Sequence, residues 1–188
     1  NMPKENLRIT GQPRFDSLNK KQKHSKQSIL KKHKFPNKKI ITYGTKFRIN
    51  EDPVLNKITD FVNSRDDLFL ILKLAPNHPS SHLKNRVRES QNVKIIRDID
   101  TRELLQVTDL FITDRSTLGI EAIVKDCPMI VFDFNKSLTF PYLTLGAAQE
   151  VKTINQFPGT IQTCLYDKKT LKNLKQGRKK FLKEYMYK

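Results

Sequence analysis

A short segment in the second half of the chain combines residue types that could bind a nucleotide. Ser116 and Thr117 stand where an apolar strand pattern gives way to a helical pattern, and Glu121 follows one turn later. Hydroxyl side chains can cap a helix while its first N–H groups and its dipole attract an anion such as a diphosphate. A carboxylate one turn further in can accept two hydrogen bonds from a ribose diol. Gly119 permits close approach of a ligand or a neighbouring backbone.

The same residues have an ordinary structural interpretation. Ser116 could simply cap a helix, and Glu121 could lie on a solvated helix face. Asp114 and Asp133 follow predicted strands, and either could be a turn residue. Spacing within this segment leaves the two interpretations open, so the surrounding elements have to be considered.

The elements around this segment alternate between strand and helix. Apolar runs predict strands at 39–43, 68–74, 93–96, 110–113 and 128–132, with a short last strand starting at Val151. Helical patterns occupy 18–33, the stretch opened by Asp52-Pro53, 80–89, the stretch capped by Thr101, 116–125, 153–164 and 168–185, and 134–150 is irregular. This alternation predicts an α/β fold, a Rossmann-like doubly wound parallel sheet of about six strands with helices on both faces. Such sheets bind ligands at the carboxyl ends of their strands.

The net charge of +17 is concentrated at the two ends of the chain. Residues 1–46 carry +11 and residues 164–188 carry +7, whereas 47–163 carry −1. Solvated helix faces explain such ends, and an anionic membrane surface or anionic acceptor would also suit them. Nucleic acid is the less favoured partner, because no helix-turn-helix, zinc-finger, RRM or KH signature accompanies the charge. Cys127 and Cys164 are too few for a disulfide framework or a structural zinc site, and Cys127 is expected in the core.

Four motifs in order resemble the donor-binding domain of GT-B fold glycosyltransferases. They are the Gly-x-Pro-x-x-Asp stretch at 11–16, the strand and loop at 40–45, the Lys-x-His-Pro-like loop at 72–79, and the Thr-Asp-Arg-Ser-Thr-Leu-Gly-Ile-Glu-Ala segment at 113–122. These motifs resemble those of the capsule and teichoic-acid CDP-glycerol glycerophosphotransferases and, more distantly, those of the UDP-N-acetylglucosamine 2-epimerases. The resemblance implies a basic interdomain linker and helix at 1–37, a donor domain at 38–188, and an acceptor domain absent from this chain.

The resemblance also assigns roles to individual residues. It implies that Glu121 holds the ribose, with Ser116, Thr117 and the neighbouring Arg115 near the diphosphate. Three further positions complete the expected site: Thr45 facing the phosphates, and Arg97 and Asp98 bordering the base.

The Lys-x-His-Pro loop departs from the family pattern. Ala75-Pro76 stands where the glycerophosphotransferases show His-Pro, and His78-Pro79 follows three residues later. His78 is therefore the candidate catalytic residue, and the alternative is a surface histidine.

The predicted function is transfer of a sugar from a nucleotide-diphosphate donor to a polysaccharide or lipid-linked acceptor, with no metal and no covalent cofactor. The predicted setting is the cytoplasm, at the inner face of the membrane. Three alternatives remain: a CDP-glycerol-type polyol-phosphate transferase, a 2-epimerase-like enzyme, and a basic module for nucleic acid or anionic lipid. The lone Glu121 departs from the paired glutamates of the epimerases. Alone, this chain is expected to be inactive, because catalysis needs both domains closed over the donor.

Overall fold

The computed structural model describes residues 24–44, 52–74, 87, 90–114, 116–134 and 141–186. Its centre is a six-stranded sheet in the order β3-β2-β1-β4-β5-β6, and each neighbouring pair is parallel. The strands are β1 (Lys39–Tyr43), β2 (Leu68–Lys73), β3 (Val93–Ile96), β4 (Leu110–Thr113), β5 (Met129–Phe132) and β6 (Gln149–Val151). The predicted doubly wound parallel sheet is confirmed.

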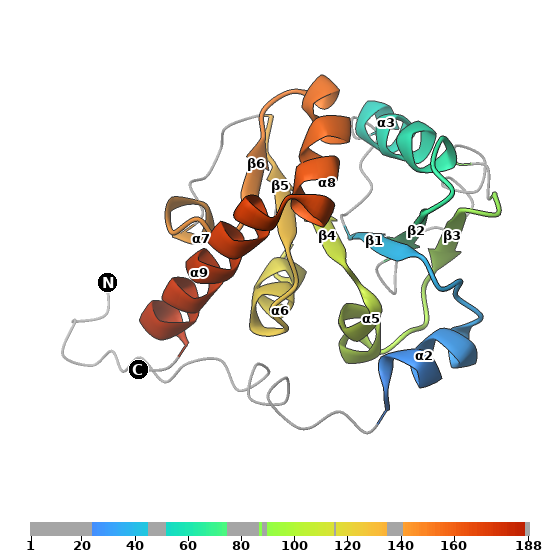
Figure 1. Cartoon of the computed structure of the whole chain (residues 1–188), viewed down its shortest axis with the longest axis horizontal. Coiled ribbons are helices and arrows are strands. Elements are labelled where there is room, and N and C mark those ends of the chain that lie inside the picture. The colour runs from blue at the N-terminus through green and yellow to red at the C-terminus, as the bar shows by residue number, and fades with distance from the viewer. Residues whose placement is uncertain are drawn as a thin grey trace, which may run out of the picture.

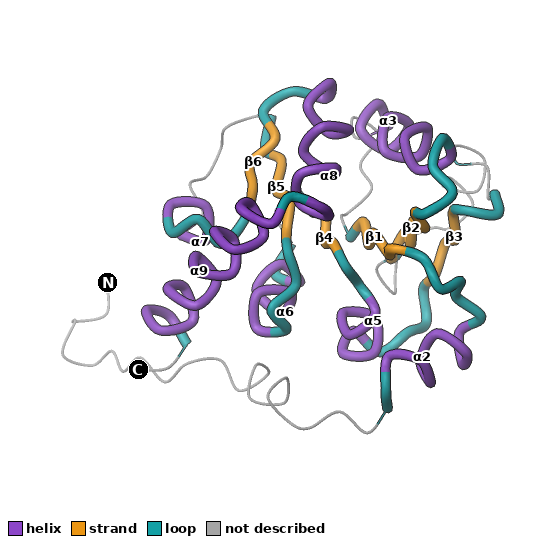
Figure 2. The backbone as a smooth tube through the Cα atoms, in the orientation of Figure 1, coloured by secondary structure: helices purple, strands orange, loops and turns teal. Residues whose placement is uncertain are grey.

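Helices cover both faces of this sheet (Figures 1 and 2). They are α2 (Lys26–His33), α3 (Asp52–Asn63), α5 (Thr101–Val107), α6 (Leu118–Val124), α7 (Pro141–Thr144), α8 (Phe157–Tyr166) and α9 (Lys168–Tyr185), with a 3-10 turn, η4 (Ile154–Gln156), before α8. Helices α3 and α8 pack on one face, where Ile58 and Phe157 join the apolar side chains of β1 and β2. Helices α2, α5 and α6 cover the opposite face, which holds Ile29, Leu104 and Phe111.

The sequence explains why the central strands are buried on both sides. Five of the six β2 residues are apolar and buried, as expected for a strand covered on both faces. The carboxyl ends of β1 and β4 are joined by side chain and backbone: the Thr113 hydroxyl donates to the Gly44 carbonyl at 2.7 Å, and the Gly44 amide donates to the Ile112 carbonyl at 2.9 Å. A Cβ atom on Gly44 would lie 2.8 Å from the Phe111 ring, so the backbone can pass here only without a side chain.

Several boundaries differ from the sequence predictions. Asp100, rather than Thr101, caps α5, because its carboxylate accepts from the Arg102 amide at 2.7 Å. The stretch predicted to be irregular contains α7, and β6 ends at Val151 instead of starting there. Helix α6 begins at Leu118, two residues later than predicted. Of the predicted helix at 80–89 only residue 87 is described, and it is a bend; residues 18–23 lie outside the described residues.

Candidate nucleotide site at the carboxyl ends of the strands

The turn from β4 into α6 brings the predicted nucleotide-binding residues to the carboxyl end of the central strands. The Ser116 hydroxyl accepts from the Leu118 amide at 3.2 Å, so Ser116 bonds to the first residue of the helix, and the N-cap is the next residue, Thr117. Thr117 is exposed and makes no side-chain capping bond. Thr117 is therefore open to solvent at the start of α6.

The first amides of α6 are partly occupied by the chain itself. The Leu118 amide donates to the Ser116 hydroxyl, the Gly119 amide to the Ser116 carbonyl at 3.0 Å, and the Ile120 amide to the Thr117 carbonyl at 3.1 Å. The expectation that capping leaves the amides of this turn unused therefore does not hold at these three positions. A diphosphate here would depend more on hydroxyl and basic side chains than the sequence alone indicated.

Glu121 is 8% exposed, although it carries a carboxylate. Gly119 turns toward the sheet, since a Cβ atom there would lie 3.1 Å from the Met129 sulfur. Helical spacing places Glu121 on the side of Leu118, three residues earlier, and Leu118 lies against Gly44 at the end of β1. Glu121, the predicted ribose ligand, thus lies on the same side of α6 as Leu118.

The end of β4 also holds a second buried acid. Asp114 follows Thr113 directly, is 8% exposed, and one of its carboxylate oxygens is buried with no hydrogen-bond partner among the described residues. Tyr142 of α7 lies near it: burial, and secondarily the charge of Asp114, raise the pKa of the Tyr142 hydroxyl well above its usual range. The sequence had left Asp114 as a turn residue, and its position directly after a buried strand was the available signal.

A lysine organises the neighbouring strand ends. The Lys73 ammonium, at the end of β2, donates to the Leu74 carbonyl at 3.0 Å and to the Arg97 carbonyl at 2.6 Å. Burial lowers the pKa of Lys73, and the Asp98 carboxylate partly opposes that shift. Lys73 therefore fixes the start of the loop that the resemblance assigns to the base. The signal in the sequence was one charge inside an apolar run.

The remaining predicted residues are distributed as follows. Arg97 is half-buried and Asp98 is exposed. Both lie directly after β3, and two strands, β2 and β1, separate β3 from β4. Thr45, His78 and Arg115 lie outside the described residues. The structure therefore brings Ser116, Thr117 and Glu121 together at one strand end, with Arg97 and Asp98 along the same edge of the sheet.

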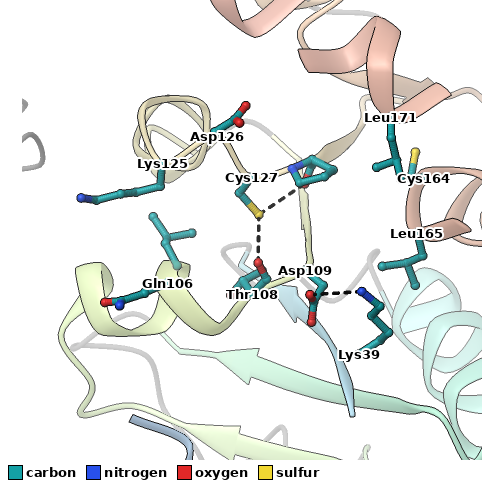
Figure 3. A pocket seen from close by; sticks show the side chains of 12 residues that line it. Lys39, Gln106, Thr108, Asp109, Lys125, Asp126, Cys127, Cys164, Leu165 and Leu171 are labelled. Atoms are coloured by element: carbon teal, nitrogen blue, oxygen red, sulfur yellow. Dashed lines mark hydrogen bonds and ion pairs between the residues drawn. The ribbon is translucent and has the colours of Figure 1, made fainter. Parts of the chain in front are cut away.

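A hollow of about 400 Å³ lies at the opposite, amino-terminal edge of the sheet (Figure 3). Lys39 at the start of β1 forms a 3.5 Å ion pair with Asp109 at its rim. Cys127 and Cys164 line it, and burial raises the pKa of each thiol to about 12, so both stay protonated at neutral pH. The prediction that Cys127 is a core residue is confirmed, since it is 3% exposed. This hollow is separate from the predicted nucleotide site.

Two absences hold for the part of the chain that the structure describes. No helix there is both long and apolar enough to cross a bilayer. No cluster of three His, Cys, Asp or Glu side chains there could hold a metal ion.

Comparison with solved structures confirms the fold. The chain is similar to a histidine variant of the wall teichoic acid polymerase TagF (17% identity, TM-score 0.71, 98% of this chain and 48% of that one). It is also similar to S. aureus MnaA bound to UDP, with 15% identity and a TM-score of 0.68 over 98% of this chain and 55% of that one. The C-terminal domain of the group 1 glycosyltransferase LpcC from Francisella tularensis is similar too, with 13% identity and a TM-score of 0.65 over 92% of this chain and 97% of that one. The chain spans 45%, 48% and 50% of the length of three of the solved structures that it resembles.

No curated protein matches the sequence significantly. The family described as CDP-Glycerol:Poly(glycerophosphate) glycerophosphotransferase matches residues 1–186. Together with the fold, this match confirms the predicted resemblance to the C-terminal domain of GT-B transferases and the predicted class, a nucleotide-donor transferase domain of the glycosyltransferase type. Matched over nearly its whole length, the chain belongs to the CDP-glycerol:poly(glycerophosphate) glycerophosphotransferase family.

Proposed function

We propose that this chain binds the nucleotide part of an activated donor at the carboxyl ends of β1 and β4. It would serve as one half of a transferase that moves a sugar to a polysaccharide or lipid-linked acceptor. The observation that carries this proposal is Glu121, a buried carboxylate one turn after Ser116 and Thr117, on the same side of α6 as Leu118.

Each residue of the site has a distinct task in this proposal. Glu121 accepts hydrogen bonds from the ribose hydroxyls. The Thr117 hydroxyl, with Arg115, meets the diphosphate and stabilises the charge that builds on it as the donor bond breaks. Lys73 holds the Arg97 carbonyl and so keeps the base-binding loop in place. His78 is the candidate acid or base.

A second candidate donor, CDP-glycerol, is favoured by the family match. The two reactions release different products. Sugar transfer breaks the bond between the sugar carbon and the β-phosphate oxygen, so the nucleotide leaves as a diphosphate. Polyol-phosphate transfer breaks the anhydride bond between the two phosphates, so the nucleotide leaves as CMP. Chromatography of the nucleotide product formed by the longer enzyme therefore separates the candidates.

Calorimetric titration of the 188-residue chain with UDP, CDP, GDP and ADP tests the binding proposal. Glu121→Gln should weaken binding of the preferred nucleotide about tenfold, which is the usual scale for hydrogen bonds to a charged group. Glu184→Gln, at an exposed position on α9, is the matched control and should bind as the parent does. If the parent bound none of the four, or if Glu121→Gln bound unchanged, the donor-site proposal would be wrong.

We further propose that this chain alone transfers little, because several of the solved structures it resembles are about twice its length and closure of two domains excludes water. Location in the cytoplasm at the inner face of the membrane, with an anionic surface as partner, fits the basic ends of the chain. Co-sedimentation with anionic vesicles, compared with neutral ones, tests the membrane part.

A further inference from the structure

One face of the last helix carries a regular row of lysines. Helix α9 contains seven lysines and one arginine but a single acid, Glu184. The lysines on one face are Lys168, Lys172, Lys175, Lys179 and Lys183, and all five are exposed. They are separated by three or four residues, so they fall within an arc of about 80° and extend along about 22 Å of the helix. We call this row the lysine stripe.

The lysine stripe is unfavourable for the helix that carries it. Like charges three or four residues apart destabilise a helix, by about 0.2–0.5 kcal/mol for each pair. Lys168 and Lys169 also occupy the first turn, which has no acid, where the helix dipole disfavours positive charge. Among the described residues, one stripe lysine has an ion pair, that of Lys175 with Asp126 at 3.5 Å. Stability of the domain therefore does not account for the stripe.

The opposite face of α9 holds the helix on the domain. Leu174, Gly177 and Phe181 are buried there, against the apolar cores on the two faces of the sheet. The helix thus lies on the outside of the domain with its apolar side used (Figure 1). An amphipathic helix that inserts into a bilayer needs that apolar side for the lipid. The exposed face of α9 therefore presents a row of positive charges to a partner and has no free apolar side to insert into a bilayer.

The spacing of the charges suits a linear polyanion. Successive stripe lysines lie about 4.5 to 6 Å apart along the helix axis. Three covalent bonds of an extended chain span at most about 3.3–3.6 Å, so the six bonds between successive phosphates of a glycerol phosphate polymer span about 7 Å. We propose that the lysine stripe binds a phosphodiester polymer lengthwise, as a holding surface for the acceptor away from the donor site. Its identification with the acceptor rests on the second candidate of the proposed function, transfer from CDP-glycerol, which the matched family favours.

A matched pair of triple variants tests this binding. The test variant carries Lys172→Gln, Lys179→Gln and Lys183→Gln, which leaves the Lys175 ion pair intact. The control carries Lys31→Gln, Lys34→Gln and Lys152→Gln, three exposed lysines outside α9, of which Lys152 has a 3.7 Å ion pair with Glu150. Both lose the same charge, and Gln is a good helix former. The probe is end-labelled soluble poly(glycerol phosphate), followed by fluorescence anisotropy over a range of salt concentrations.

The test variant should bind the polymer on the order of tenfold or more weaker, with a shallower dependence of affinity on salt. The control should remain close to the parent. The test variant should also be at least as stable as the parent, because it loses like-charge repulsion. Equal weakening in both variants, or a less stable test variant, would overturn the proposal.

Two further measurements complete the test. One distinguishes a polymer from a lipid as the source of the phosphate, and the other distinguishes the lysine stripe from the donor site. Vesicles of phosphatidylglycerol and phosphatidylcholine should bind the two variants equally; a loss confined to the test variant here, without a loss of polymer binding, would assign the stripe to membranes instead. Nucleotide titrations should be the same for both variants and the parent. A failed donor site would show in the parent's nucleotide titration, whereas a failed stripe would show in the polymer titration.

Discussion

Gly177 in the middle of α9 is the position where one added methyl group should have the largest effect on stability. A Cβ atom there would lie 2.0 Å from the Gly146 carbonyl oxygen, 2.1 Å from the Gly146 carbonyl carbon and 2.6 Å from the Ala147 nitrogen. Ordinary contacts begin at 3.4 Å, so the helix and the 146–147 turn would have to separate by more than 1 Å. All three atoms belong to the backbone, and no rotamer change can relieve them.

The expected magnitude follows from two opposing terms. Replacing glycine by alanine inside a helix stabilises it by about 1 kcal/mol. Overpacking typically costs about 1–3 kcal/mol and sometimes more, and a backbone obstruction belongs at the upper end. Gly146 has a φ of 70°, a left-handed conformation that limits how its turn can adapt. We expect Gly177→Ala to lower the free energy of unfolding by about 2 kcal/mol and the Tm by about 4–8 °C.

Urea unfolding and a thermal scan measure this loss. Gly159→Ala in α8 is the matched control, because a Cβ atom there meets nothing within 4 Å. It should leave the free energy of unfolding unchanged or raise it by up to about 1 kcal/mol. If Gly177→Ala were as stable as Gly159→Ala, then α9 would not pack against the 146–147 turn as described.

Three other substitutions test separate parts of the fold. Gly44→Ala should lower the free energy of unfolding by about 1–3 kcal/mol, since the new methyl group meets a buried aromatic ring of β4; urea unfolding measures it, and an unchanged midpoint would contradict it. Asn tolerates the left-handed φ of 53° at position 126, so Asp126→Asn tests the side-chain charge alone. The buried Arg178 binds that charge at 2.8 Å, so the substitution should lower the free energy of unfolding by about 1–3 kcal/mol. An unchanged free energy of unfolding would show that the ion pair adds no stability. The Lys32 ammonium holds the pKa of Glu103 below its usual range, so this carboxylate stabilises the fold at neutral pH and loses that contribution as the pH falls through its lowered value. Glu103→Gln should therefore make stability less sensitive to acid, and equal pH profiles for variant and parent would refute this.

The strongest local patterns in the sequence predicted the fold well. The apolar run at 68–74 became the buried strand β2, and the bounds of α9 agree with the prediction at both ends. Helix α3 starts at Asp52, so its start was predicted to within one residue, and Pro53 lies in its first turn. These signals succeed because each is local: burial on both faces, proline in the first helical turn, and a charged face with helical period.

The prediction was poorer where tertiary contacts decide the structure. Helix α7 has four residues, too few for a helical period, and it is held by burial of Tyr142 beside Asp114. The candidate site shows the same division. Glu121 was identified from its spacing to Ser116, whereas the role of Lys73 depends on a carbonyl of the neighbouring strand end. No local sequence pattern around Lys73 shows that the Arg97 carbonyl will be its hydrogen-bond partner.

The strand order has a consequence for the chain during its synthesis. Strands β1, β2 and β3 are made first and can pair with one another, but the other side of β1 pairs only with β4, which starts at Leu110. Until that residue leaves the ribosome, β1 presents an unpaired apolar edge, and such an edge is prone to join with other chains. A pause in translation before β4 should therefore favour aggregation more than a pause after β5.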